Sequence, residues 1–241
     1  MLENRIPLRE RVIFALDVPG EKEAKALVEQ LGSSVEFYKV GLELFTSGSY
    51  FSLVSWLQDK GKKVFADLKL FDVPATVGRA VRQLQNLGLE FCTVHGNDAM
   101  LAAAVREKGT LKILAVTALT SLDRNDLDDL GFQCDVETLV HSRARRAIEL
   151  GCDGIVSSGL EIAKIRKSFG NCFLIVSPGI RPVDNISTTD DQKRVVSVEQ
   201  AFLAGADYIV LGRPIRDAQD PCAAAEAIQA SIAKIFSKGH V

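Results

Sequence analysis

Short apolar runs alternate with longer amphipathic stretches from one end of the chain to the other. Several of these runs lack the polar alternation of a half-exposed strand, which is typical of strands buried on both faces. We therefore predict eight strands, at residues 12–16, 37–40, 64–66, 91–94, 113–116, 154–156, 173–176 and 208–211.

The stretches between these runs have the pattern of helices. They are clearest at residues 21–31, 75–87 and 136–150, and the last repeats apolar residues with a period near 3.6. Three amphipathic stretches end on a glycine just before the next apolar run, at Gly88, Gly151 and Gly205. Glycine suits the left-handed residue that closes a helix, so we expect a helix end at each of these positions.

Eight strands, each followed by a helix or a long loop, predict an α/β protein with the (β/α)8 architecture of a TIM barrel. The alternative is a doubly wound open sheet, which normally breaks into fewer units. We find no linker or low-complexity tract, so the expectation is a single domain over residues 1–241.

Composition narrows the classes of partner. The chain has 47% hydrophobic and 25% charged residues and a net charge of −2, so no general attraction to nucleic acid or anionic lipid is expected. No window reaches the ~20 apolar residues of a membrane span. The five cysteines are scattered without a C-x-x-C pair, and the histidines show no metal-binding spacing. We expect buried free thiols, no metal and a cytoplasmic location.

Charged residues gather where the predicted strands end. Asp17 follows the first strand, Lys39 lies near the end of the second, and Asp67 and Lys69 follow the third. Active sites of this fold lie at the carboxyl ends of the strands, and side chains two apart on a strand share a face. The pattern predicts a network of alternating charge suited to proton transfer. A purely structural salt bridge at the strand end is the alternative.

A second cluster has the features of a phosphate site. Gly212 and Arg213 follow the last strand, where many such barrels bind phosphate with backbone N–H groups. The alternative is a turn glycine beside a surface arginine. Residues 181–196 are polar and without periodicity, and we predict a phosphate lid there, with Gln192 able to reach a ligand.

Seven sequence blocks, in order, resemble the orotidine 5′-phosphate decarboxylases of bacteria, which catalyse the last step of UMP synthesis. The most specific block joins Asp-x-Lys-x-x-Asp to Val73-Pro74, and the resemblance covers nearly the whole chain. The blocks are Ala15-Leu16-Asp17, Tyr38-Lys39-Val40-Gly41, Asp67-Leu68-Lys69-Leu70-Phe71-Asp72-Val73-Pro74, Thr93-Val94-His95, Val116-Thr117-Ala118-Leu119-Thr120-Ser121, Ser177-Pro178-Gly179-Ile180-Arg181-Pro182 and Leu211-Gly212-Arg213-Pro214-Ile215.

The resemblance implies a cofactor-independent decarboxylation of orotidine 5′-phosphate to UMP and carbon dioxide. Lys69 would be the general acid that protonates carbon six of the ring, and Asp67 would lie beside the departing carboxylate. Lys39 and Asp17 would complete the charge network and hold ribose hydroxyls.

The resemblance also implies a homodimer, in which Asp72 and Thr76 reach into the partner's site. The remaining substrate-binding residues it implies are Thr120 at the pyrimidine, Gln192 between base and phosphate, and Arg181, Gly212 and Arg213 at the phosphate. Ala75 departs from the asparagine of many family members, and a minor effect is expected.

Two other functions share parts of this pattern. A magnesium-dependent sugar-phosphate decarboxylase or synthase shares the Asp-x-Lys-x-x-Asp core but needs metal ligands at the rim. A non-catalytic phosphate-binding barrel would keep Gly212 and Arg213 while losing Lys69 or Asp67, and both charged residues are present.

Overall fold

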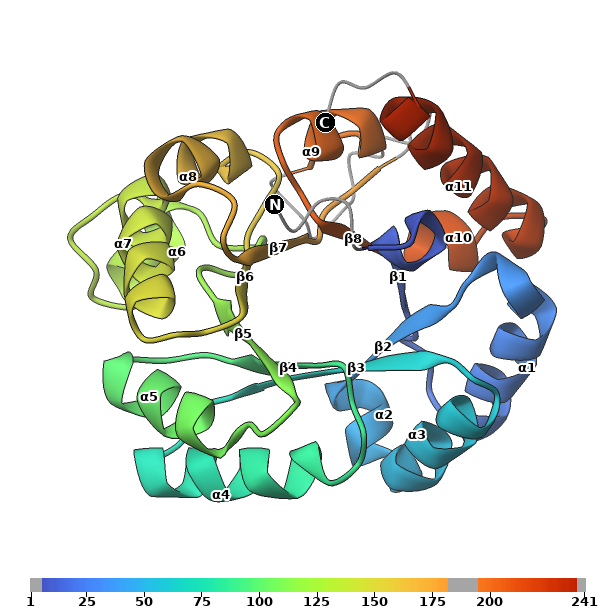
Figure 1. Ribbon diagram of the computed structural model, residues 1–241, viewed down its shortest axis with the longest axis horizontal. Helices are drawn as coiled ribbons and strands as arrows, with labels where there is room; N and C mark the ends of the chain where they lie inside the picture. Colours follow the sequence, from blue (N-terminus) through green and yellow to red (C-terminus); the bar gives the residue numbers. More distant parts are fainter. Residues whose placement is uncertain (1–5, 182–194, 238–241) are drawn as a thin grey trace.

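Eight parallel strands close into one barrel in chain order, as predicted. The structure is a computed structural model that describes residues 6–181 and 195–237, and helices surround the barrel (Figure 1). The strands are β1 (Val12–Ala15), β2 (Phe37–Gly41), β3 (Lys63–Leu70), β4 (Phe91–Val94), β5 (Lys112–Val116), β6 (Gly154–Val156), β7 (Leu174–Ser177) and β8 (Tyr208–Leu211).

Helices follow the strands and pack on the outside of the barrel. The α-helices are α1 (Glu21–Leu31), α2 (Leu42–Thr46), α3 (Tyr50–Asp59), α4 (Pro74–Gln85), α5 (Asp98–Glu107), α6 (Arg124–Asp129), α7 (Val136–Glu149), α8 (Ile162–Phe169), α9 (Val198–Leu203), α10 (Arg213–Arg216) and α11 (Pro221–Ser237). Two 3₁₀ helices, η2 (Leu8–Arg11) and η3 (Gly32–Ser34), precede β1 and β2.

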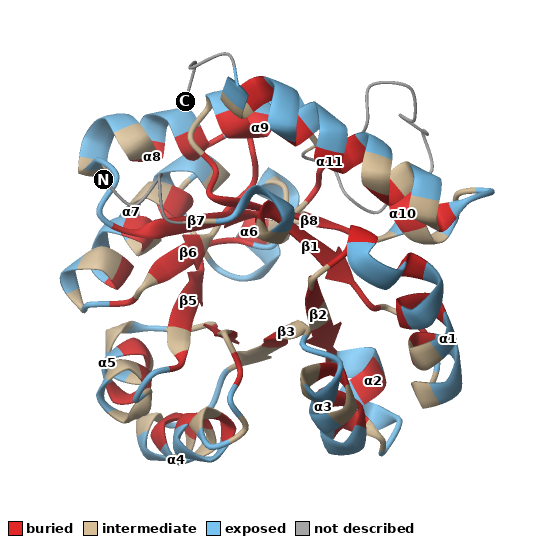
Figure 2. Ribbon diagram, turned by 45° about the vertical axis from the view of Figure 1, so that its right-hand side comes forward, coloured by how far each residue is buried: buried red, intermediate tan, exposed pale blue. Residues whose placement is uncertain are grey.

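The apolar residues form two layers, as two-sided burial of the strands requires. Figure 2 shows buried strands at the centre and helices that expose their outer faces. One cluster fills the barrel and includes Phe37, Phe65, Phe91 and Tyr208, whose rings pack edge to face or tilted. The larger cluster lies between strands and helices.

Most predicted boundaries agree with the structure within two residues, and β3 is the exception. It continues to Leu70, four residues past its predicted end, so Asp67 and Lys69 lie inside the strand and not after it. The predicted helix at 75–87 begins one residue earlier, because proline suits the first helical turn. The three helix-closing glycines have positive φ as expected: 65°, 81° and 103° at Gly88, Gly151 and Gly205.

The prediction that the cysteines are buried was only partly right. All five are free, and Cys92 and Cys152 are buried, but Cys172 is exposed and Cys134 and Cys222 are half-buried. None of the helices formed by residues 6–181 and 195–237 has the length and apolar character needed to cross a bilayer.

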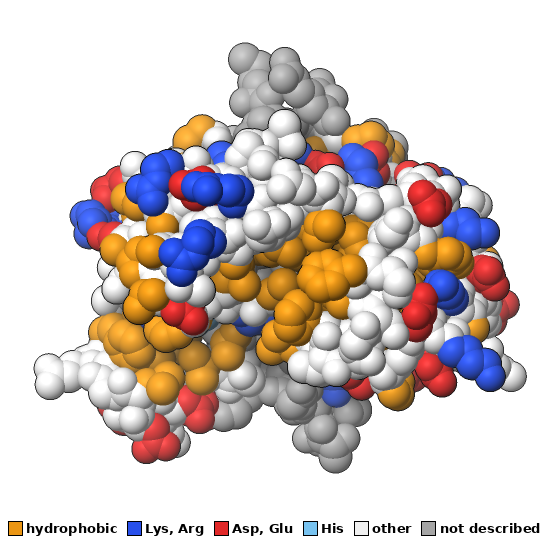
Figure 3. Space-filling model, turned by 90° about the horizontal axis from the view of Figure 1, so that it is seen from below, with side chains coloured by type: hydrophobic (Ala, Val, Ile, Leu, Met, Phe, Trp, Pro, Cys, Tyr) orange, Lys and Arg blue, Asp and Glu red, His pale blue; other side chains and the backbone are white. Residues whose placement is uncertain are grey.

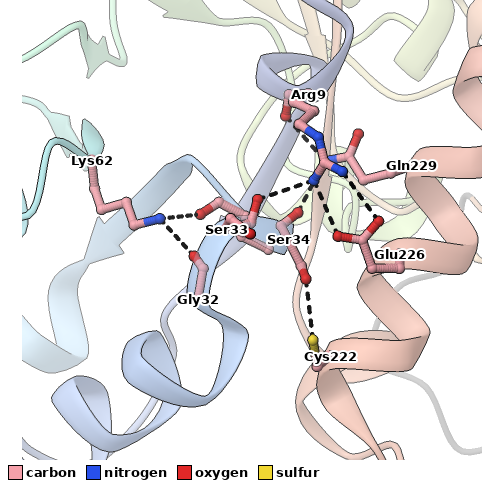
Figure 4. Close-up of polar contacts among 9 residues, drawn as sticks. Arg9, Gly32, Ser33, Ser34, Lys62, Cys222, Glu226 and Gln229 are labelled. Carbon is pink, nitrogen blue, oxygen red and sulfur yellow. Dashed lines mark hydrogen bonds and ion pairs between the residues drawn. The ribbon is translucent and has the colours of Figure 1, made fainter.

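Polar contacts join the first and last elements where the barrel strands begin (Figure 4). Arg9 of η2 donates to the Ser33 carbonyl at 3.0 Å and pairs with Glu226 of α11 at 3.1 Å. The buried Gln229 amide donates to the Arg9 and Ser34 carbonyls at 3.1 and 3.2 Å. These contacts hold α11 against the segments that lead into β1 and β2, at the end opposite the charged rim.

Candidate active site

The third strand carries two of the charged residues, and its pairing with β4 is irregular. The register between β3 and β4 shifts between Ala66 and Leu70. Lys69 lies in this bulge with a φ of 48°. A left-handed backbone costs a residue with a Cβ on the order of 1 kcal/mol, so the surrounding contacts must hold it there.

Four alternating charges from neighbouring strands form one chain of ion pairs. Lys69 Nζ lies 2.8 Å from Asp67 Oδ2, and Lys39 Nζ lies 3.5 Å from the same oxygen. Lys39 Nζ also lies 3.0 Å from Asp17 Oδ1. The predicted convergence of these four side chains is therefore confirmed. Lys39 and Asp67 are each 12% exposed, whereas Lys69 is 34% and Asp17 47% exposed.

Burial and charge oppose each other at the two inner members of the network. Burial alone would lower the pKa of Lys39, but the carboxylates of Asp67 and Asp17 outweigh it and the pKa is raised. Burial would likewise raise the pKa of Asp67, but the ammonium groups of Lys39 and Lys69 hold that pKa below its usual range. Both inner groups therefore stay charged at neutral pH.

A hydroxyl from β4 completes the contacts of the buried carboxylate. Thr93 Oγ1 donates to Asp67 Oδ1 at 2.9 Å, and the backbone N–H of Lys69 donates to the same Oγ1 at 2.9 Å. Thr93 is fully buried. Both oxygens of Asp67 are thus occupied by donors from the protein.

The network borders a cavity of about 440 Å³, within the ~300–1,000 Å³ range of small-molecule sites. Charged residues and the ends of the apolar strands share its wall. The lining residues are Ala15, Asp17, Lys39, Phe65, Asp67, Lys69, Val116, Ala118, Leu119, Thr120, Val156, Pro178, Gly179, Arg181, Val210, Gly212, Arg213 and Arg216.

Glycine and arginine gather in one part of this lining. Gly212 follows β8 and precedes the short helix α10, whose Arg213 and Arg216 both line the cavity. Arg216 Nη1 donates to the Asp17 carbonyl at 2.7 Å, which ties α10 to the end of β1. Gly179 has a φ of 75°, a conformation that lets the chain turn tightly after β7.

The structure places the other predicted residues in three ways. Thr120 and Arg181 line the cavity, whereas Asp72 and Thr76 do not line the cavity of their own chain. Gln192 and most of the predicted lid lie outside the described residues. Where the described chain stops and resumes, Arg181 N donates to the Val196 carbonyl at 3.0 Å.

Comparison with known proteins places this chain in a family. The model of the Orotidine 5'-phosphate decarboxylase / HUMPS family matches residues 10–228, which include every strand of the barrel. The chain belongs to this family. The expectation drawn from the seven sequence blocks is confirmed at that level.

Relatives with curated names narrow the assignment within the family. Residues of this chain are 63% identical over 239 positions to "Orotidine 5'-phosphate decarboxylase" of Methylococcus capsulatus, covering 99% of this chain and 98% of that one. The protein of that name from Xanthomonas campestris pv. campestris is 50% identical over 235 residues, or 95% and 96% of the two chains. The crystal structure of the protein of that name from Lactobacillus acidophilus has a TM-score of 0.81 and 36% identity, covering 92% of this chain and 99% of that one.

Sequence reasoning missed two residues that belong to this site. Arg216 lies three positions after Arg213, a helical spacing that could have marked it as a second arginine on the same side of α10. Thr93 stood in one of the family blocks without a role. Its contact with β3 depends on the bulge, which the apolar pattern does not encode.

Proposed function

We propose that this chain catalyses the cofactor-independent decarboxylation of orotidine 5′-phosphate to UMP and carbon dioxide, in the cytoplasm. One observation carries the proposal. The Lys69 ammonium is held 2.8 Å from the buried Asp67 carboxylate, at the wall of a cavity that is also lined by Arg181, Arg213 and Arg216. A cation fixed beside an anion can act where negative charge develops and disappears.

The proposed decarboxylation requires a cation beside the reacting carbon. When carbon dioxide leaves, the electron pair of the broken bond stays on carbon six of the pyrimidine, which has no adjacent electron sink. The Lys69 ammonium stabilises this carbanion and then transfers a proton to that carbon, and Lys69 recovers a proton from water. Asp67 lies beside the departing carboxylate, and Lys39 and Asp17 hold it in place while contacting ribose hydroxyls.

The arginine-rich part of the cavity binds the 5′-phosphate. Arg213 and Arg181 offer forked donors and Gly212 offers a backbone N–H, while Thr120 contacts the pyrimidine. The phosphate takes no part in bond breaking, so its binding energy can instead hold the ring against the charged network.

The sugar-phosphate reaction of the same barrel group would need carboxylates that bind magnesium. Here the two oxygens of Asp67 contact lysine and threonine donors, and Asp17 pairs with Lys39. The named relatives at 63% and 50% identity are decarboxylases of orotidine 5'-phosphate, and neither favours the sugar-phosphate alternative.

The test is the loss of orotidine 5′-phosphate absorbance by purified protein in excess EDTA. Turnover that is equal with EDTA and with added magnesium is expected. Turnover that appears only with magnesium, or only with a sugar phosphate as substrate, would overturn the proposal in favour of the alternative reaction.

We place Asp72 and Thr76 in the site of a second copy of this chain. Both lie near the start of α4 and outside their own cavity. Beside them Phe71 and Val73 are 67% and 62% exposed, and Leu42, Phe45 and Phe51 of α2 and α3 are exposed as well. Figure 3 shows apolar side chains gathered on the side of the molecule that includes these helices. Apolar surface of this kind is typical of an interface between subunits.

Subunit mixing tests this arrangement. Lys69→Ala and Asp72→Ala homodimers are each expected to be nearly inactive, and a mixture that exchanges subunits should recover about a quarter of wild-type activity, because half the dimers hold one intact site. The matched control mixes Lys69→Ala with Lys39→Ala. Both residues act in the site of their own chain, so every site in the mixed dimer carries one substitution and no recovery is expected. Absence of recovery in the first mixture would show that Asp72 does not act across the interface.

A further inference from the structure

One hydroxyl group contacts both Asp67 and Lys69 of β3. Thr93 Oγ1 donates its only proton to Asp67 Oδ1 and uses a lone pair to accept the backbone N–H of Lys69, each at 2.9 Å. Thr93 has no exposed surface, so water does not compete for either bond. The two contacts are therefore stronger constraints than the same bonds at a surface would be.

The backbone N–H that donates to Thr93 belongs to Lys69, which has an unusual backbone conformation. Lys69 is the one non-glycine residue with positive φ within the described ranges 6–181 and 195–237. Such a conformation persists only where neighbouring contacts over-determine it. The regular pairing of β3 with β4 is lost between Ala66 and Leu70, and the Thr93 side chain takes the place of a strand carbonyl there.

The left-handed turn at Lys69 determines where its side chain lies. The Nζ atom stays 2.8 Å from Asp67 and at the cavity wall, although the strand is bulged between regular pairs. If the bulge relaxed, the chain would carry the ammonium away from its present position. A displacement of about 1 Å in such a group can lower a rate by ~10²-fold.

We infer that Thr93 is a positioning residue, whose hydroxyl fixes the Asp67 carboxylate and the Lys69 backbone so that the Lys69 ammonium faces the cavity. Thr93 does not line the cavity and acts only through these two residues. Its role in catalysis rests on the proposed function, whereas its role in holding the Lys69 backbone does not.

The kinetic test uses Thr93→Val, which keeps the shape of the side chain and removes the hydroxyl. We expect kcat for orotidine 5′-phosphate to fall by ~10- to 100-fold while KM changes less than about threefold. Thr93→Ser restores the hydroxyl and should return kcat to within about threefold of wild type. Should Thr93→Val not fold, Thr93→Cys, a weaker donor and acceptor, should give an intermediate kcat.

The matched control is Thr117→Val. Thr117 is also fully buried at the end of a strand, but its hydroxyl donates to the Val156 carbonyl at 2.8 Å and contacts neither charged residue. It should lose stability to a similar degree and keep kcat within about threefold of wild type. Equal kcat losses in Thr93→Val and Thr117→Val, or a wild-type kcat in Thr93→Cys, would overturn the inference.

A crystal structure of Thr93→Val, or of Thr93→Cys should the first not fold, separates this inference from the proposed function. We expect Lys69 to leave the left-handed region or its Nζ to move away from Asp67. Retention of both features would refute the positioning role even if the wild type did not decarboxylate the nucleotide. Failure of the wild-type assay together with this displacement would refute the proposed function alone.

Discussion

Asp67 is the residue on which the other charges converge. It contacts two ammonium groups at one oxygen and a hydroxyl at the other. A buried carboxylate is costly unless it is paired and hydrogen-bonded, and these contacts keep it charged beside the position proposed for the substrate carboxylate. Because three protein donors contact its two oxygens, the Asp67 carboxylate cannot rotate without breaking the network.

At Arg213 the proposed phosphate binding can be tested separately from the chemical step, because this residue lines the cavity and is not part of the Asp67–Lys69 network. We expect Arg213→Ala to lower kcat/KM by about 2–4 kcal/mol of transition-state stabilisation, because charge-assisted bonds to the phosphate are lost. Steady-state kinetics with orotidine 5′-phosphate measures this. Arg82→Ala, which breaks the exposed ion pair between Arg82 of α4 and Glu107 of α5, is the control and should stay within about twofold. Unchanged efficiency in Arg213→Ala would remove this residue from the phosphate site.

Residue-level prediction from sequence worked where a local rule applied. The two-residue spacing of Asp67 and Lys69 predicted that they would lie on one side, and their 2.8 Å contact agrees, although Lys69 reaches it from a left-handed backbone in the bulge. The positive φ of Lys69 had no local signal, since lysine rarely adopts it and no glycine or asparagine marks the position. It follows from the bulge and from Thr93, which are tertiary features.

At the element scale, strand packing leaves almost no space around Gly154 inside the barrel. Gly154 of β6 faces this interior, where a Cβ would lie 2.6 Å from the Leu174 carbonyl oxygen and 2.9 Å from Leu114 Cδ2. Strand backbone cannot move aside as a flexible side chain can, so the glycine is required by close approach and not by its own φ.

Gly154→Ala should therefore lower the free energy of unfolding by about 1–3 kcal/mol, through overpacking of the barrel interior. Urea denaturation followed by Trp56 fluorescence gives the value. Gly20→Ala is the comparison, because a Cβ there meets only the end of the Glu23 side chain, and it should cost less than ~1 kcal/mol. Equal stability of the Gly154 variant and the wild type would contradict the packing described here.

The apolar pattern located all eight strands but not the length of β3. Strands β4, β6 and β8 begin and end where their apolar runs do. In β3 the hydrogen-bonded pairing with β2 continues through Asp67, because the paired charges satisfy one another and can be buried. A pattern based on hydrophobicity ends the strand at the first charged residue and cannot anticipate this.

At the scale of the whole molecule, polar contacts join η2, near the start of the described chain, to α11 at its end. The Arg9–Glu226 pair is about half exposed on both sides, so solvent screens it and it contributes little. Gln229 instead satisfies two carbonyls in a buried position between η2, η3 and α11. The buried amide and not the ion pair is expected to stabilise this junction.

Gln229→Leu should accordingly lower the free energy of unfolding by about 1–3 kcal/mol, since two carbonyls lose their donor. Glu226→Ala should cost less than ~1 kcal/mol. Both are measured by the same denaturation experiment. A larger loss in Glu226→Ala than in Gln229→Leu would reverse the ranking and show that the ion pair is the main contact.

The proposed role of Lys69 as the acid of the decarboxylation can be tested in a single comparison. It measures kcat/KM for orotidine 5′-phosphate in wild type and in Lys69→Ala, with UMP binding by calorimetry for both proteins. We expect rapid turnover by the wild type, a loss of at least ~10⁴-fold in the variant, and UMP affinity within about tenfold of wild type. Turnover by Lys69→Ala within about tenfold of wild type would contradict this role.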